Sequence, residues 1–274
     1  MKNGTSDVYP LVSVVLTTYN REKILWRAMN SVLRQTYKNI ELVVVNDYST
    51  DNTEKLLAEY AAKDSRIIVV NRKEPSAVEQ KRTGIPTEPA NDGLRIASGR
   101  YIAHLDDDEM YCPDKIWLSV KIMEEQPQVG LLHGDWLAVG LGEGGKETIG
   151  ISCGRDVDYE YLLKHGSDFG NFRVMYRKSV YDSVGDWSFD ISKGRTKRDG
   201  QTGSDYNYWL RVAKKYIIKH APVIMGIVVF KDHPDYWNPD RDFWAIKEWF
   251  CHHRPTNTIH YGGRCFGWDS EEKQ

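Results

Sequence analysis

Leu105-Asp106-Asp107-Asp108-Glu109 places four consecutive acids directly after the apolar run Tyr101-Ile102-Ala103-His104. The apolar run is typical of a buried strand, and residues 113–123, with proline first and apolar positions at helical spacing, are typical of a helix. The acids are therefore expected on a turn between a strand and a helix, where open α/β sheets bind their ligands. Carboxylates this close repel one another, and a divalent metal ion carrying a diphosphate would neutralise them. A solvated acidic loop is the alternative.

The composition is that of an ordinary globular protein. The chain has 274 residues, of which 41% are hydrophobic, and its formal net charge is −2. This length fits one large domain, or one domain with an appendage. The near-neutral charge argues against a general nucleic-acid-binding protein, which needs a basic surface to neutralise phosphates. The four cysteines have no CxxC spacing, so neither a zinc knuckle nor a disulfide framework is expected.

Hydropathy argues against a membrane-spanning segment. No apolar run approaches the roughly 20 residues that cross a bilayer, and residues 1–7 lack the apolar core of a signal peptide. These features predict a cytoplasmic protein. They leave open a peripheral association with a membrane and the formation of a homodimer.

The first half of the chain alternates strand-like and helix-like segments, which is typical of a parallel sheet with crossover helices. Continuous apolar strands are expected at 11–16, 40–45 and 67–70. Helices are expected at 24–33, from the capping-box spacing of Asp51 and Glu54 onward, and at 91–98.

The second half is less regular. Its expected elements are a glycine-rich connection at 140–154, a strand at 172–176, a helix at 204–216 and a further strand at 223–230. The residues from 231 on are rich in Trp, Phe, His and Arg without a clear period, and we interpret them as a lid. Their aromatic rings suit stacking on sugars, and they suit a hydrophobic core equally well.

Five stretches of the chain share the order and spacing of motifs in one known family. They are VSVVLTTYNR (12–21), SVLRQTY (31–37), ELVVVNDYSTDNT (41–53), ASGRYIAHLDDDE (97–109) and GSDYNYWLRVA (203–213). Together they resemble family 2 glycosyltransferases, and the resemblance extends over roughly residues 11–235.

The resemblance implies the α/β fold called GT-A, which is Rossmann-like: a mostly parallel central sheet flanked by helices, with a C-terminal extension on the acceptor side. Residues 1–110 would bind the nucleotide sugar, and residues 111–235 would form the acceptor and catalytic half of the same domain. Residues 236–274 would form a tail or lid.

The implied function is an inverting transfer of a sugar from a nucleotide diphosphate donor, with a UDP-sugar favoured, to a hydroxyl group of a glycan, a lipid-linked acceptor or a small molecule. The implied cofactor is Mn²⁺ or Mg²⁺. Two alternatives stay open. One is a nucleotidyltransferase on a related sheet, which the absence of a phosphate-binding loop rich in glycine and lysine disfavours. The other is a non-catalytic nucleotide-binding module.

The resemblance gives the acids separate roles. Asp106 and Asp107 would contact the nucleotide, and Asp108 would ligate the metal. Asp205, at the start of the helix expected at 204–216, would act as the general base. A carboxylate that caps this helix is the alternative for Asp205.

Further nucleotide contacts are implied for Thr17, Tyr19, Asp47, Arg72 and Lys81. Tyr19 would stack on the base, and the acceptor-only carboxylate of Asp47 suits the N3–H of uracil. His233 would complete the metal shell, since a neutral imidazole can ligate Mn²⁺. A structural or solvated role is the alternative for His233.

The chain departs from the commoner family pattern at Ala90, Ser204 and Asn46. Ala90 stands where a basic residue usually precedes an asparagine, so an expected basic contact is missing and the donor sugar is harder to assign. The other two departures leave the neighbouring carboxylates in place.

Overall fold

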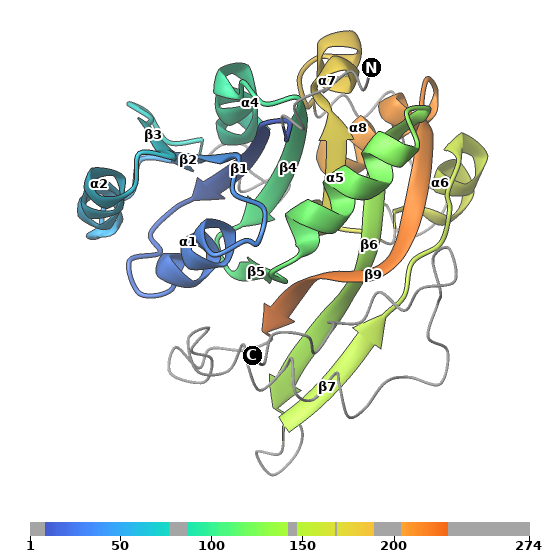
Figure 1. Cartoon of the computed structure of the whole chain (residues 1–274). Helices are drawn as coiled ribbons and strands as arrows, with labels where there is room; N and C mark the ends of the chain where they lie inside the picture. Colours follow the sequence, from blue (N-terminus) through green and yellow to red (C-terminus); the bar gives the residue numbers. More distant parts are fainter. Residues whose placement is uncertain (1–8, 77–86, 142–146, 168, 189–203, 230–274) are drawn as a thin grey trace, which may run out of the picture.

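The computed structural model describes residues 9–76, 87–141, 147–167, 169–188 and 204–229. These residues form one sheet of nine strands in the order β3-β2-β1-β4-β8-β6-β9-β5, with β7 paired to β6 (Figure 1). Helices lie on both sides of the sheet. The expected α/β fold is confirmed.

The first part of the sheet is parallel, as predicted. Its strands are β1 (Val12–Thr18), β2 (Ile40–Asn46), β3 (Ile67–Asn71) and β4 (Tyr101–Asp106). β1 lies between β2 and β4, and β3 pairs with the outer side of β2. β1, β2 and β4 are buried at nearly every position, which is what a continuous apolar strand requires when both faces are covered.

Helices cover both faces of the parallel part. α1 (Leu25–Leu33) and α2 (Thr53–Lys63) contribute to the hydrophobic cluster on one face. α4 (Thr87–Ile96) packs on the other face. It lies so close to β1 that a Cβ atom added to Gly93 would come within 2.5 Å of Val15 Cγ1, so glycine is needed at this contact.

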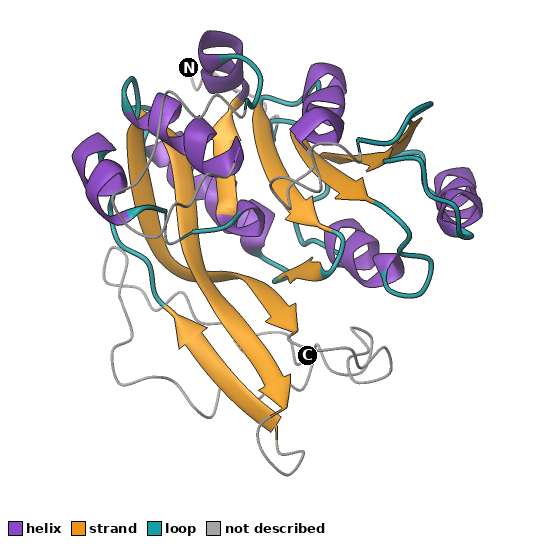
Figure 2. Cartoon of the chain, turned by 180° about the vertical axis from the view of Figure 1, so that it is seen from behind, coloured by secondary structure: helices purple, strands orange, loops and turns teal. Residues whose placement is uncertain are grey.

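The second part of the sheet is mixed. It comprises β5 (Glu109–Tyr111), β6 (Val129–Leu141), β7 (Glu147–Ser152), β8 (Val174–Arg177) and β9 (Ile217–Val229). β8 is antiparallel to both β4 and β6, whereas β6 and β9 are parallel to each other. Seen from behind, its long strands extend beyond the helices (Figure 2).

The remaining helices pack beside this second part. They are α5 (Lys115–Glu125), α6 (Tyr159–His165), the 3₁₀ turn η2 (Asn171–Arg173), α7 (Lys178–Val184) and α8 (Ser204–Ala213). α6, α7 and α8 share a cluster of aromatic and aliphatic residues with α4. In the described ranges, none of the helices has the length and apolar character needed to cross a bilayer.

The acidic turn differs from its prediction, because a strand and not a helix follows it. The turn connects β4 to the short strand β5, which pairs antiparallel with β9 at Val228, Ile227 and Gly226. α5 begins only at Lys115. A strand of three residues that depends on a partner more than a hundred positions away carries no periodicity in the sequence.

Three helices have different bounds from those expected. The helix expected at 91–98 begins at Thr87, because Pro89 falls in its first turn, where the missing N–H is not needed. α2 begins at Thr53 without the capping box: the Asp51 carboxylate accepts the N–H groups of Thr53 (2.9 Å) and Glu22 (3.1 Å). α8 ends at Ala213, and β9 begins six residues before the strand expected at 223–230.

The glycine-rich connection expected at 140–154 contains the end of β6 and the whole of β7. β6 reaches Leu141 and β7 runs back beside it, with Leu141 opposite Glu147. The proposed boundary at residue 110 falls inside β5, and the tail at 236–274 lies outside the described residues. The division of the chain into these parts stays a proposal.

Lys115 is fully buried at the start of α5. Its Nζ donates to the carbonyl oxygen of Val174 at 3.0 Å and lies 4.1 Å from the ring centroid of Tyr111. Burial lowers the pKa of Lys115 well below its usual value. Burial therefore makes the charged form of this side chain more costly in the folded protein than in water.

We predict that Lys115→Met raises the free energy of unfolding at pH 7 by about 1–3 kcal/mol. A base with a lowered pKa in the folded state binds more protons when unfolded, so the wild type gains stability as pH rises toward about 10.4. The advantage of the variant should therefore shrink between pH 7 and pH 9.5. Urea unfolding across this range measures it, with the exposed Lys55→Met as control. A difference that does not change with pH would contradict the prediction.

Candidate active site

The predicted site residues of the first half meet at the carboxyl edge of the parallel strands. Thr17 lies between Val45 of β2 and Asp106 of β4 in the sheet register. Tyr19 follows β1, and Asp47 follows β2. The structure therefore brings together five of the predicted residues at one edge: Thr17, Tyr19, Asp47, Asp106 and Asp107.

Arg21 neutralises part of the acidic turn. Its Nε lies 3.1 Å from Asp107 Oδ1, and its Nη2 lies 3.5 Å from Asp108 Oδ2. The backbone N–H of Tyr19 also donates to Asp107, at 3.3 Å. Arg21 is the last residue of the motif at 12–21, and the sequence analysis gives it no role. The available signal was a basic residue just after the first strand, whose end meets the acidic turn in a parallel sheet. Asp108 keeps 55% of its side chain exposed, so it remains open to solvent cations.

The buried acids of the turn hold protons more tightly than usual. Burial raises the pKa of Asp106 to about 7, with further increases from the charges of Asp108, Asp107 and Asp205. Burial also raises the pKa of Asp107 to about 6, against the opposing charge of Arg21.

Glu109 is the partner of Asp106 that the sequence did not single out. The two carboxyl groups are hydrogen-bonded, and the pKa of Glu109 is raised well above its usual value, first by burial and then by the charge of Asp106. Glu109 Oε2 is buried without a hydrogen-bond partner. A hydrogen bond between two carboxyl groups needs a proton on one of them, so we infer that the pair shares one proton.

Asp205 lies in the first turn of α8, as predicted. Burial raises its pKa, whereas its hydrogen bond from the backbone N–H of Tyr206 (2.7 Å) opposes this. Its charge contributes to the raised pKa of Asp106, so α8 brings it near the acidic turn. A carboxylate in the first turn also stabilises the start of the helix, although Asp205 lies inside α8 and not at the N-cap position that the alternative expects.

Asp47 is held rigidly at the end of β2. Its Oδ1 accepts hydrogen bonds from Arg72 Nη1 (2.8 Å) and from the N–H of Ser76 (3.1 Å), and its Oδ2 accepts one from the Ser76 hydroxyl. Only 2% of the side chain is exposed. A nucleobase N–H that approached this carboxylate would therefore compete with Ser76, a residue the sequence reasoning did not consider.

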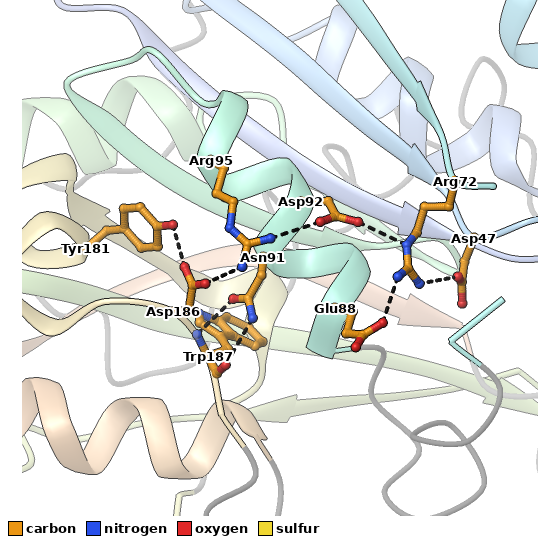
Figure 3. Close-up of polar contacts among 9 residues, drawn as sticks. All are labelled: Asp47, Arg72, Glu88, Asn91, Asp92, Arg95, Tyr181, Asp186 and Trp187. Carbon is orange, nitrogen blue, oxygen red and sulfur yellow. Dashed lines mark hydrogen bonds and ion pairs between the residues drawn. The ribbon is translucent and has the colours of Figure 1, made fainter. Parts of the chain in front are cut away.

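Arg72 lies beside Asp47, and its N–H groups point to three carboxylates (Figure 3). Besides Asp47, they contact Glu88 Oε2 at 2.7 Å and Asp92 Oδ2 at 3.0 Å. Both acids belong to α4. The guanidinium group thus positions Asp47 and ties the end of β2 to α4, whereas a direct contact with a nucleotide stays a prediction.

The ion pairs continue from α4 toward the second half of the chain (Figure 3). Arg95 pairs with Asp92 at 3.0 Å and with Asp186, which also accepts a hydrogen bond from Tyr181 at 2.7 Å. Asn91 exchanges two hydrogen bonds with the backbone of Trp187, at 2.8 and 3.0 Å. In the pair Ala90-Asn91, the basic residue of the commoner family pattern is missing. The asparagine of this pair binds the protein backbone.

Two predicted site residues, Lys81 and His233, lie outside the described residues. Within the described part, no group of three or more His, Cys, Asp or Glu is arranged to hold a metal ion. The acidic turn nevertheless fits ions such as Mg²⁺ chemically, since proteins bind them through one or two carboxylates together with substrate phosphates. Asp108, exposed and paired only loosely with Arg21, is the acid best placed for this.

Comparison with known sequences identifies relatives of this chain. The family model described as "Glycosyl transferase family 2" matches residues 13–184. The putative glycosyltransferase EpsE of Bacillus subtilis is 31% identical over 206 residues, which are 74% of this chain and 66% of that protein. An Escherichia coli protein named UDP-Glc:alpha-D-GlcNAc-diphosphoundecaprenol beta-1,3-glucosyltransferase WfaP is 36% identical over 116 residues, 42% of each chain. In an uncharacterized glycosyltransferase of Rickettsia bellii, the match spans only 15% of the relative's length.

Solved structures share the fold. S. aureus TarS 1-349 in complex with UDP superposes with a TM-score of 0.57 at 20% identity, covering 86% of this chain and 63% of that one. The mannosyltransferase PcManGT from Pyrobaculum calidifontis, in complex with GDP-Man and Mn²⁺, gives a TM-score of 0.55 at 18% identity. The match covers 89% of this chain and 64% of that one. These similarities confirm the expected GT-A fold. Because the family match spans more than half of the sequence, the chain belongs to glycosyl transferase family 2.

Proposed function

We propose that this chain is an inverting, metal-dependent glycosyltransferase that moves a sugar from a UDP-sugar to a hydroxyl acceptor. The observation that carries the proposal is the acidic turn at the carboxyl edge of the parallel strands, with Asp47 directly after β2 at the same edge and Asp205 near Asp106. In this proposal the acidic turn would bind the metal ion, Asp47 would accept a nucleobase N–H, and Asp205 would take part in proton transfer.

The preference for a UDP donor rests on Asp47 and on the relatives. A carboxylate only accepts hydrogen bonds when ionised, which matches the N3–H donor of uracil. WfaP is named for a UDP-Glc donor, and TarS has been crystallised with UDP. PcManGT binds GDP-Man, so the fold by itself does not select the base.

Asp108 would hold the metal ion, with the diphosphate oxygens completing its shell, and His233 would be a further ligand. When bound, Mn²⁺ or Mg²⁺ would stabilise the negative charge of the departing nucleoside diphosphate. Arg21 occupies the cation position beside Asp107 and Asp108 in the structure. With a metal ion bound, Arg21 would be free to contact the phosphates of the donor, which a guanidinium group binds readily.

Asp205 would act as the general base. Its carboxylate would take the proton of the acceptor hydroxyl while the acceptor oxygen bonds to the anomeric carbon and the bond to the diphosphate breaks. A single displacement of this kind inverts the anomeric centre. A raised pKa suits the role, because a base is most effective when its pKa lies near the working pH.

The identity of the acceptor and the location of the protein in the cell stay proposals. WfaP is named for a lipid-linked acceptor, which agrees with a peripheral role at a membrane.

A nucleotidyltransferase would release pyrophosphate instead of UDP, and a non-catalytic module would release neither. The identity of the released product therefore separates the three functions.

We predict that Asp108→Ala weakens UDP binding in the presence of Mn²⁺ by about 10- to 100-fold, because a contact with a charged group is worth about 1.5–3 kcal/mol. Titration calorimetry with and without Mn²⁺ measures the effect, with Glu59→Ala on the exposed face of α2 as control. Equal affinity in the variant and the wild type would disprove the role of Asp108 as a ligand.

We predict that Asp205→Asn keeps the affinity for UDP and Mn²⁺ but lowers sugar transfer by about 10²- to 10⁴-fold, the usual contribution of a general base. Release of UDP from a panel of UDP-sugars, with mixed glycan and lipid-linked acceptors, provides the assay. Asp182→Asn, an exposed change on α7, is the control. Retained turnover would rule out Asp205 as the base.

We predict that Mn²⁺-dependent UDP binding strengthens from pH 5 to pH 8. The pKa values of about 7 for Asp106 and about 6 for Asp107 mean that both carboxyl groups are protonated at pH 5 and ionised at pH 8. A cation binds the ionised forms, so the affinity follows their deprotonation. Calorimetry at fixed ionic strength tests this, and an affinity that falls with rising pH would contradict it.

A further inference from the structure

Tyr48, the residue directly after Asp47, has an unusual backbone conformation. Its φ angle is 61°, in the left-handed region. A bulky side chain there brings Cβ too close to the following carbonyl oxygen, so glycine or asparagine is the ordinary choice. Strain of this kind persists where the surroundings enforce it, and it is concentrated at functional sites.

The surroundings of Tyr48 do enforce its conformation. Asn46 Oδ1 accepts the N–H of Ser49 at 3.2 Å and so closes the loop around Tyr48, while Asn46 Nδ2 donates to Asn71 at 2.9 Å. The loop is also tied to the one after β1: the N–H of Asn20 donates to Ser49 Oγ at 2.9 Å. Asn20 itself has a φ of 53°, so the two loops with left-handed residues brace each other.

The bracing leaves two aromatic rings exposed at the same edge. Tyr19 is 40% exposed and Tyr48 is 48% exposed. Thr18 and Asn46 are paired at the ends of β1 and β2. Tyr19 comes directly after Thr18, and Tyr48 comes two residues after Asn46. A ring that is half exposed contributes little to the core, so packing does not account for a tyrosine where the backbone favours glycine.

We propose that Tyr48 is a second aromatic contact for the nucleobase, in addition to Tyr19. The inference rests on the proposed function, in which this edge holds a nucleotide. Rings stack on any base, so the two tyrosines supply affinity and the neighbouring Asp47 supplies selectivity for a base with an N–H donor. The left-handed backbone is maintained because it presents the Tyr48 ring at this edge.

The test separates base contacts from phosphate contacts. Tyr48→Gly, Tyr48→Phe and the control Tyr9→Ala are titrated with UDP and, separately, with inorganic pyrophosphate, each with Mn²⁺. Tyr9 is exposed at the opposite end of β1. We expect Tyr48→Gly to weaken UDP binding about fivefold or more, as for loss of a stacked ring, and to leave pyrophosphate binding unchanged. Tyr48→Phe and Tyr9→Ala should bind UDP like the wild type.

Thermal stability without ligand provides the second readout. Tyr48→Gly should unfold at a temperature at least as high as the wild type, because glycine tolerates the left-handed conformation. Unchanged UDP affinity in this variant, or an equal loss for UDP and pyrophosphate, would overturn the inference and leave the proposed function standing. A wild type that binds no UDP in the presence of Mn²⁺ would overturn the nucleotide site itself, and the inference with it.

Discussion

Mutual repulsion among the carboxylates of the acidic turn is the constraint on which the rest of the site depends. The sheet brings the end of β4 beside the ends of β1 and β2, and so concentrates negative charge in a partly buried place. The protein meets this cost in two ways: Arg21 pairs with Asp107 and Asp108, and Asp106 and Glu109 are hydrogen-bonded with raised pKa values. In the proposed function, a divalent cation would take over from both arrangements by neutralising the same carboxylates.

A second set of charges connects the end of β2, where we propose that the nucleobase binds, with α8, which carries the proposed general base. Arg72 joins Asp47 to α4, and Arg95 joins α4 to Asp186. Arg211 of α8 donates to the backbone carbonyl of Asp186 at 2.6 Å, which brings the connection to the helix that carries Asp205. The proposed donor and acceptor sides are thus connected by ion pairs that cross α4 and by this hydrogen bond, although the two halves of the chain differ in strand direction.

The sequence predicts the parallel half well because its strands are continuous apolar runs and its motifs lie at strand ends. It predicts the positions of Asp47 and Asp106 for the same reason, and that of Asp205 from the helix expected at 204–216. β5 was missed because its three residues are specified only by pairing with β9. The roles of Arg21, Ser76 and Glu109 were missed because they depend on contacts between segments distant in sequence, such as Ser76 with Asp47. The pairing of Arg72 with two acids of α4 follows from the packing of that helix, which the sequence does not specify.

The central claim is that the acidic turn binds a divalent metal ion together with UDP. Thermal unfolding with UDP, GDP, dTDP and CDP, each with and without Mn²⁺, tests it most directly. A ligand at about 100 times its dissociation constant adds roughly 2.7 kcal/mol, which raises the midpoint of a chain this size by several degrees. The account predicts a rise with UDP only when Mn²⁺ is present. No rise with any nucleotide, or an equal rise without the metal, would contradict it.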